Sequence, residues 1–405
     1  MGTLDLPGKA LVLVENLSVP LDRRVWQEAT SLTKAGFRVF VVCPRGAKMD
    51  REPIEYLEGV EIYRYPLTPA AAGPSGYIRE YLQAFWHTVR LVRKLAREHR
   101  FDVVQACNPP DFLLAAAWPL KRRGSALIFD HHDLVPELYL SRFERGKDML
   151  YRTVLAVERL AFRLADVVMA TNESYRHVAL TRGRKHDSDV FVVRSAPDLT
   201  QFRQCDPDVT LKRGKQHLIS YLGVMGPQDG VDHALHALAA VREHRQDWHA
   251  IFMGGGDVLE AMRTLSKELG MAEMVDLPGR VPDDYVARVL SSSDVCLAPD
   301  PKNPLNDVST MNKILEYMAM SRPIVSYDLR EARVSAGDAA LYCRPNDVAS
   351  FAAAVERLLD NPALRERMGA TGRARVENEL SWQQSERALL SAYERAIQRR
   401  RPHAP

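Results

Sequence analysis

Two cycles of short apolar runs, each alternating with amphipathic helical patterns, follow one another along the chain. Strands that alternate with helices form parallel βαβ units, so each cycle predicts an α/β domain with a doubly wound parallel sheet. The first cycle predicts a helix at 22–34 and strands at 10–14, 39–42, 60–65, 102–105, 127–130, 166–170 and 190–193. The second predicts helices at 232–245, 259–269 and 285–291, and strands at 217–223, 249–253, 275–277, 294–298 and 324–327.

The length of 405 residues also indicates two domains, because it exceeds the size of one ordinary domain. We expect a first domain at 1–197, a polar linker at 198–216 and a second domain at 217–381. Further amphipathic helices are predicted at 348–359 and 381–398. Ligands of open parallel sheets bind beyond the carboxyl ends of the strands, so two such domains imply a cleft with one ligand on each side.

Composition excludes several classes of protein. Charged residues are 26% and hydrophobic residues 46%, as in ordinary globular proteins, and a net charge of +3 predicts no general nucleic-acid surface. None of the five cysteines lies in a Cys-x-x-Cys pair, so we expect neither a zinc site nor a disulfide framework. No long uncharged apolar run and no signal peptide is present, and we expect a cytoplasmic protein.

The segment 306–326 reads as a polar loop, a short helix and a buried strand. Asp307, Ser309 and Thr310 are candidate N-caps of the helix, because their oxygens can accept the free N–H groups at its start. Lys313 and Glu316 lie three residues apart and share one face near the positive helix end, which suits a phosphate. Glu316 can accept both hydroxyls of a ribose. The alternative is a capped helix with a solvated ion pair.

The segment 316–325 resembles the donor-sugar signature of the retaining nucleotide-sugar glycosyltransferases of family 4, which have the GT-B fold. The resemblance implies two Rossmann-like domains facing across a cleft, with 382–405 crossing back onto the first domain. It makes Glu316 the ribose-binding glutamate. Ser309, Thr310 and Lys313 are further candidate donor-site residues, although they replace the small and apolar residues that the family usually has there. The segment also departs from the family at Val308, where the family usually carries a first glutamate.

Three glycine-containing loops also resemble donor loops of this family, where they lie against the diphosphate, the nucleotide and the base. Their candidate residues are Gly223, Met225 and Gly226, then Gly254 and Gly255, and then Gly279 and Arg280. Glycine lets the backbone approach a pyrophosphate closely. The family's arginine and lysine of the first loop are replaced near Met225, Gln228 and Asp229. Plain strand-to-helix turns remain the alternative.

In the first half, His132 and Asp133 follow a predicted strand and match the family's catalytic His-Asp. A histidine here can bond a sugar hydroxyl, shield an oxocarbenium-like transition state, or transfer a proton, because its pKa is expected to lie near neutrality. A metal site is the alternative interpretation of the histidine and aspartate residues, but the resemblance implies that no metal is required.

The loop after the first predicted strand carries Asp22-Arg23-Arg24-Val25, as in a bacterial subgroup of the family. Arg23 or Arg24 can meet an acceptor phosphate or the leaving group; the alternative is a helix capped by Asp22 with solvated arginines. Asn172 either lies near the sugar or caps the following helix.

A predicted helix at 77–100 combines aromatic and basic side chains, which is typical of helices that lie on anionic membranes. The alternative is an ordinary amphipathic helix in which Leu82, Val89 and Leu95 face the core.

The resemblance therefore implies a retaining transferase that uses a UDP-hexose or UDP-N-acetylhexosamine and no cofactor or metal. The acceptor can be a glycan, a lipid-linked saccharide or a secondary metabolite. Two alternatives remain: a nucleotide-sugar 2-epimerase of the same fold, and a non-catalytic sugar-nucleotide-binding partner of another transferase.

Overall fold

The computed structural model describes residues 8–46, 50–68, 74–143, 146–200 and 202–400. The chain divides into two compact units, unit 1 (Met1–Ser195 with Gln383–Pro405) and unit 2 (Ala196–Trp382). The predicted divisions at 197/198 and 381/382 lie within two residues of these, and the predicted linker lies in unit 2.

Unit 1 is built on an eight-stranded sheet in the order β3-β4-β2-β1-β5-β6-β7-β8, parallel except for the β3–β4 pair. Its strands are β1 (Gly8–Leu13), β2 (Phe37–Pro44), β3 (Ile54–Leu57), β4 (Val60–Tyr65), β5 (Val103–Cys107), β6 (Ala126–His131), β7 (Val167–Ala170) and β8 (Val190–Val192). Its helices are α1 (Arg23–Lys34), α2 (Pro74–Glu98), α3 (Trp118–Lys121), α4 (Val135–Phe143), α5 (Met149–Leu164) and α6 (Glu173–Thr181), with 3-10 turns η1 (Asp111–Ala117) and η2 (Asp187–Asp189). β5, β6 and β7 are buried along their whole length, which is why they read as continuous apolar runs.

Unit 2 has a six-stranded, fully parallel sheet in the order β11-β10-β9-β12-β13-β14. Its strands are β9 (His217–Leu222), β10 (Trp248–Met253), β11 (Val275–Gly279), β12 (Val295–Ala298), β13 (Ile324–Tyr327) and β14 (Ala340–Cys343). Its helices are α7 (Val231–His244), α8 (Leu259–Glu268), α9 (Asp283–Ser292), α10 (Asn312–Ala319), α11 (Arg330–Ala336), α12 (Val348–Leu359) and α13 (Pro362–Asn378). The 3-10 turns are η3 (Val209–Lys212), η4 (Pro227–Asp229), η5 (Asn306–Val308) and η6 (Gly337–Ala339). Both sheets therefore have the doubly wound order that the sequence predicts.

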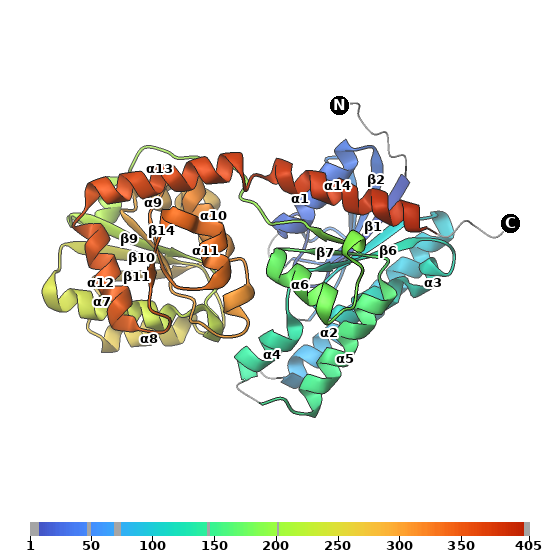
Figure 1. The fold of residues 1–405 in the computed structure, drawn as a ribbon, viewed down its shortest axis with the longest axis horizontal. Helices are drawn as coiled ribbons and strands as arrows, with labels where there is room; N and C mark the ends of the chain where they lie inside the picture. The colour runs from blue at the N-terminus through green and yellow to red at the C-terminus, as the bar shows by residue number, and fades with distance from the viewer. Residues whose placement is uncertain (1–7, 47–49, 69–73, 144–145, 201, 401–405) are drawn as a thin grey trace. The chain divides into compact units, whose positions relative to one another are not determined.

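The last helix, α14 (Trp382–Arg399), belongs to unit 1 from Gln383 onward, and Figure 1 draws it beside α1, β1 and β2. The buried Tyr393 hydroxyl donates to Gln105 Oε1 at 2.7 Å, and its ring meets Phe37 edge-on at 5.4 Å between centroids. Arg395 and Arg399 form ion pairs with Asp189. These contacts fix the C-terminal helix to the sheet of unit 1.

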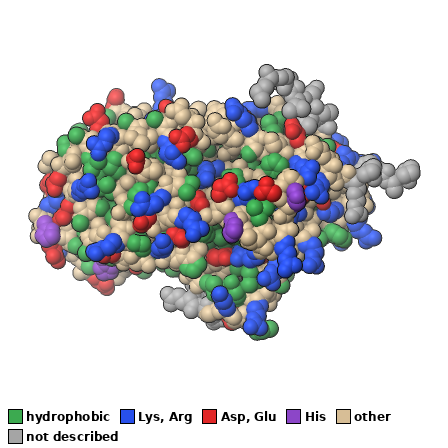
Figure 2. Space-filling view, viewed as in Figure 1, with side chains coloured by type: hydrophobic (Ala, Val, Ile, Leu, Met, Phe, Trp, Pro, Cys, Tyr) green, Lys and Arg blue, Asp and Glu red, His purple; other side chains and the backbone are tan. Residues whose placement is uncertain are grey.

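Several helices and strands of the structure were not predicted from the sequence patterns. The short edge strand β3 has an exposed and half-buried surface, and β14 and α11 are only four and seven residues long. α13 lacks a wide apolar stripe because it packs through glycine: a Cβ on Gly369 would lie 2.2 Å from the backbone oxygen of Ser321. Within the described residues, no helix combines the length and the apolar character that crossing a membrane requires. On the face shown in Figure 2, basic and acidic side chains are interspersed.

Candidate functional site

The strand order of unit 2 reverses between β9 and β12, and such a switch point is where open α/β sheets bind ligands. Gly223 follows β9 directly, and Asp300 lies two residues beyond β12. The predicted donor segment, from Ser309 to Glu316, comes next along the chain and contributes α10. The fold therefore brings the predicted donor residues of unit 2 to one edge of the sheet.

Backbone hydrogen bonds hold the three glycine loops of unit 2 together. Gly223 N–H donates to Met253 O at 3.0 Å, and Gly254 N–H donates to Gly279 O at 2.9 Å. Gly254 has φ +140°, and a Cβ there would lie 1.7 Å from the oxygen of Gly223, so this position requires glycine. A Cβ on Gly255, by contrast, would meet nothing within 4 Å. The loops thus present a backbone surface with open space at Gly255.

Met225 is a predicted residue of the first glycine loop, and its side chain points into the core. Its side chain is fully buried in the hydrophobic core of unit 2. Its N–H donates to Gly255 O at 2.9 Å, and its own oxygen accepts from Val258 N–H at 3.1 Å. An apolar side chain after a buried strand enters the core, and here it anchors the loop. Gly226 N–H donates to Asp229 Oδ2 at 2.8 Å.

Lys313 lies beneath the first glycine loop rather than in solvent. A Cβ on Gly223 would lie 3.1 Å from Lys313 Cε, and the ammonium is 5.1 Å from the centre of the Tyr221 ring. Lys313 Nζ forms a buried ion pair with Asp300 Oδ1 at 2.6 Å, whereas Asp300 Oδ2 has no hydrogen-bond partner in the described structure. Burial lowers the pKa of Lys313, but Asp300, Tyr221 and Asp229 together raise it overall, so the ammonium stays charged.

The start of α10 differs from the prediction. The helix begins at Asn312, and its N-cap, Met311, makes no side-chain capping bond. Asp307 Oδ1 instead accepts from Arg330 N–H at the start of α11, and Ser309 Oγ donates to Leu305 O. The reason is that 306–308 form a separate 3-10 turn, which ends in extended backbone at Ser309.

An α10 start without a side-chain cap has amide N–H groups oriented toward its N-terminal end, where an anion is stabilised. Thr310 and Glu316, on either side of this helix start, are half-buried. Arg280, directly after β11, is exposed and has no hydrogen bond or ion pair with the described residues. Unit 2 therefore combines a backbone loop surface, a helix start and polar side chains at one sheet edge.

In unit 1, Asn108 positions the turn that carries His132 and Asp133. Its Oδ1 accepts from both His132 N–H at 2.9 Å and Asp133 N–H at 3.0 Å. Its Nδ2 donates to Asp133 O at 2.6 Å and to Asp111 Oδ1 at 2.8 Å. One buried amide therefore fixes both residues of the predicted catalytic pair. Asn108 was not predicted, although its place directly after β5 and before two prolines is a signal for it.

Asp130, at the end of β6, controls the charge of His132. His132 Nδ1 lies 3.2 Å from Asp130 Oδ2. Burial lowers the pKa of His132, but the charge and hydrogen bond of Asp130, together with the charge of Asp133, raise the pKa to about 9. His132 is therefore an imidazolium at neutral pH, suited to donating a hydrogen bond and stabilising negative charge. This differs from the prediction of a near-neutral pKa that suits proton transfer. The side chain of Asp133 is half-buried, and burial raises its pKa.

Arg24 is a buried structural cation, not a free phosphate ligand as one prediction had it. Its guanidinium binds both oxygens of Asp130, at 2.7 and 3.1 Å, lies 3.2 Å from Glu28 Oε1, and donates to Val193 O at 2.8 Å. Arg24 lies on the inward face of α1, one residue after the exposed Arg23. Asp22 caps α1 by accepting from Val25 N–H at 3.1 Å, as the alternative interpretation expected, although of the two arginines only Arg23 is exposed.

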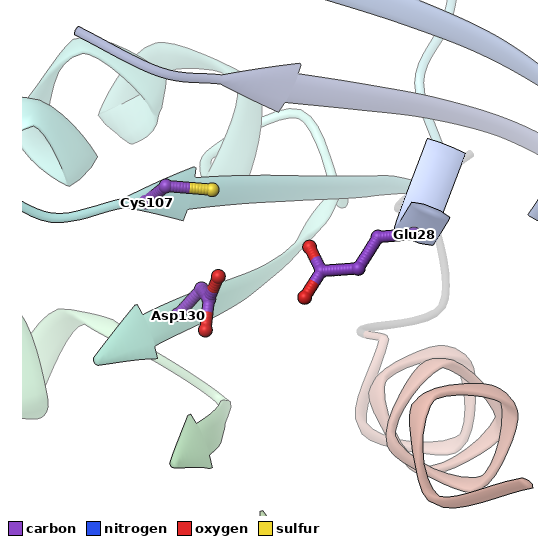
Figure 3. A group of neighbouring side chains, drawn as sticks. All are labelled: Glu28, Cys107 and Asp130. Atoms are coloured by element: carbon purple, nitrogen blue, oxygen red, sulfur yellow. The ribbon is translucent and has the colours of Figure 1, made fainter. Parts of the chain in front are cut away.

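The same region holds a set of ligand-type atoms. Glu28, Cys107 and Asp130 place a carboxylate oxygen, a thiol sulfur and a second carboxylate oxygen within 4.8 Å of one another, and Figure 3 shows the carboxylates converging from α1 and β6. The Arg24 guanidinium already binds both carboxylates, and burial raises the pKa of the Cys107 thiol well above its ordinary value. These groups fit an internal ion-pair network better than a metal site.

Asn172 caps α6, since its side chain accepts from Tyr175 N–H at 2.8 Å, and it is fully buried. This is the capping interpretation of the sequence.

All five cysteines are unpaired, and four of them are buried.

Two family models match the chain. The "glycosyl transferase 4-like domain" model matches residues 21–196, and the "glycosyl transferases group 1" model matches residues 216–361. Alpha-D-kanosaminyltransferase of Streptomyces kanamyceticus is 26% identical over 56% of this chain and 58% of its own length. MMP alpha-(1->4)-mannosyltransferase of Mycolicibacterium hassiacum is 30% identical over 46% of this chain and 45% of its own length. The chain thus spans about half the length of these two relatives.

Solved structures agree at the level of the fold. Sucrose-phosphate synthase of Thermosynechococcus elongatus superposes with a TM-score of 0.76 at 17% identity, over 97% of this chain and all of that one. Anabaena HepE in complex with UDP-glucose gives a TM-score of 0.73 at 14% identity, over 96% and 99%. The two family models together cover most of the chain, which belongs to the glycosyltransferases with the GT-B fold.

Proposed function

We propose that this protein is a retaining glycosyltransferase that moves a hexosyl or N-acetylhexosaminyl group from a nucleoside diphosphate, UDP first, to an acceptor hydroxyl. The observation that carries the proposal is the sheet edge of unit 2. Glycine backbone, the start of α10 and Glu316 meet there at a strand-order switch point, within the segment that matches the group 1 model. A protein whose structure is similar, HepE, is solved with UDP-glucose.

Each donor contact follows from the chemistry of the residues. The open backbone at Gly255 allows a diphosphate to approach, and the start of α10 supplies N–H donors for its oxygens. Glu316 accepts the two ribose hydroxyls. The exposed Arg280 guanidinium stacks on or beside the base, because a planar cation suits an aromatic face.

The charge that develops on the leaving diphosphate is stabilised by a protein cation in this proposal, without a metal. His132, held as an imidazolium by Asp130, is the cation that this proposal uses, because the ammonium of Lys313 is already paired with Asp300. A leaving phosphate oxygen takes the proton of the acceptor hydroxyl as that hydroxyl attacks the same face of the sugar. The contribution of the protein is to position the reactants and stabilise charge, so no pair of catalytic carboxylates is required.

One observation favours a second candidate function. Met225 is buried, and the ammonium of Lys313 is already paired with Asp300, so the first glycine loop offers no cation of its own to a diphosphate. A non-catalytic subunit that binds a sugar nucleotide and supports a partner transferase would tolerate this. A 2-epimerase of the same fold would turn over its donor without an acceptor.

The test is a calorimetric titration of the full chain with UDP-, GDP-, ADP- and dTDP-sugars, with and without EDTA. We expect saturable binding of one of them, unchanged by EDTA and weakened at least tenfold by Glu316→Gln. The control is Glu268→Gln, an exposed glutamate at the end of α8. Binding of none, or equal binding by the two variants, would overturn the donor site.

A second measurement separates the activities. Purified protein is incubated with the donor that binds and a panel of acceptors, and the anomeric configuration of any product is read by NMR. An α-linked product from an α-linked donor supports retention, whereas an inverted product contradicts it. Donor turnover without acceptor would indicate the epimerase.

A further inference from the structure

Unit 1 contains an apolar groove between α2, α4, α5 and the η1 turn. Its volume is about 240 Å³. Its wall from α5 consists of Leu150, Thr153, Val154 and Val157, and its other walls are mostly aliphatic and aromatic. Pockets that enclose whole drug-sized ligands are larger, roughly 300–1,000 Å³. The groove therefore fits one apolar segment of a ligand whose remainder lies outside.

An exposed apolar stripe on α2 begins in the groove and continues away from it. Ile78 and Leu82 line the groove, and Trp86 follows one turn later; their exposed fractions are 49%, 59% and 58%. These residues are four apart, so they share one face of the helix. Of the candidate core residues Leu82, Val89 and Leu95, Leu95 is buried and Val89 packs against the core, whereas Leu82 is exposed.

Among the groove-lining residues, Asp111 carries a carboxyl oxygen that forms no hydrogen bond in the described structure. Asp111 is 3% exposed and lines the groove, and its Oδ2 has no hydrogen-bond partner. A buried carboxyl oxygen without a partner is costly, unless a ligand donates to it. Its other oxygen accepts from Asn108, which also fixes His132 and Asp133. The groove is therefore rigidly joined to the candidate catalytic turn.

The two helices that flank the groove expose mainly positive charge. The exposed cations are Arg79, Arg90, Arg93, Lys94 and Arg97 on α2, Lys147 just before α5, and Arg152, Arg159 and Arg163 on α5. None of them forms an ion pair with a carboxylate in the described part of the chain. In Figure 2, blue Lys or Arg and green hydrophobic side chains lie together low in the view, where Figure 1 places α5. Apolar groups bordered by cations are complementary to an anionic lipid surface.

We propose that this groove holds the proximal part of the hydrocarbon chain of an anionic lipid acceptor, with the α2 stripe and its flanking cations lying against the membrane surface. Where the acceptor carries a saccharide, one of its hydroxyls then donates a hydrogen bond to Asp111 Oδ2, which an ionised phosphate cannot do. This assignment rests on the proposed transferase function and narrows its acceptor to a lipid phosphate or lipid-linked saccharide. A membrane contact by α2 alone would require neither the groove nor Asp111.

The test uses farnesyl phosphate as the probe, with farnesol and inorganic phosphate for comparison, in calorimetric titrations of the full chain. Thr153→Trp fills the groove from an exposed position on α5. Ala156→Trp is the matched control, because this residue is exposed on the same helix but does not line the groove. We expect farnesyl phosphate to bind at least tenfold more weakly to Thr153→Trp, with Ala156→Trp unchanged and Asp111→Asn no weaker than the parent, because this probe has no hydroxyl that could donate to Asp111.

Vesicle flotation supplies the second readout, with phosphatidylcholine alone and with added phosphatidylglycerol. We expect the protein to float only with vesicles that contain the anionic lipid. Brominated acyl chains should quench the tryptophan fluorescence, and this quenching should be lost in Trp86→Phe.

Equal binding of farnesyl phosphate by the two tryptophan variants would overturn the groove assignment. Equal binding of farnesol, or of inorganic phosphate, would overturn the anionic lipid as occupant. Titration of the same samples with the sugar nucleotide separates the two proposals. A protein that binds a sugar nucleotide but no lipid phosphate refutes only the lipid-acceptor inference. Loss of sugar-nucleotide binding refutes the proposed transferase function.

Discussion

Replacing Arg24 by methionine tests whether this arginine serves the fold or the substrate. The change removes the guanidinium from Asp130 and Glu28, whose side chains are fully buried. Removing one partner of a buried ion pair costs about 3–5 kcal/mol, because the remaining charge is left without compensation. A domain of this size loses about 2–4 °C of Tm per kcal/mol, so we expect unit 1 to unfold about 6–20 °C earlier.

The matched control is Arg23→Met, which changes the adjacent but exposed arginine and should alter stability by no more than about 0.5 kcal/mol. Calorimetry gives the transitions of the full chain, and hydrogen exchange of α1 and β6 assigns the loss to unit 1. Arg24→Met combined with Asp130→Asn should recover part of the loss, since one uncompensated charge is then removed. A loss below about 1 kcal/mol, or equal losses for the two arginines, would refute the buried-network reasoning.

Three further outcomes are expected. Gly254→Ala should abolish sugar-nucleotide binding in calorimetry, because its Cβ would lie 1.7 Å from the Gly223 oxygen. Gly255→Ala should bind the sugar nucleotide with an affinity within a few-fold of that of the parent protein, because its Cβ would meet nothing within 4 Å. Since the folded-state pKa of His132 is raised from 6.5 to about 9, its stabilising effect is fully present below pH 6.5 and lost as the pH rises through 9. The stability difference between the parent and His132→Asn, measured by urea denaturation, should therefore shrink across that window; a difference constant from pH 6 to 10 would contradict the ion pair. Tyr393→Phe should cost about 1 kcal/mol, as expected for one buried hydrogen bond, and no measurable loss would mean that its hydroxyl does not anchor α14.

The glycosyltransferase class and most of the two sheets were predictable from the sequence, because fully buried parallel strands appear as apolar runs between amphipathic helices. The predicted bounds of β13 and α12 match the structure residue for residue. Capping chemistry is equally local, so Asp22 was recognisable before α1. The elements that the patterns missed, such as α13, are those whose packing depends on a close backbone approach rather than on an apolar stripe.

Electrostatic partners across the sheet were not predictable, because they join residues far apart in the chain. The sequence showed two adjacent arginines, but only the packing of α1 against β6 buries Arg24 beside Asp130 and leaves Arg23 exposed. Similarly, Lys313 reads as a free helix-end cation until the fold places Asp300 against it. The sequence by itself determined the periodicities, and with them the strands, helices and donor motif. Only the tertiary structure decided which charges are buried and paired, since burial and pairing depend on contacts between distant segments.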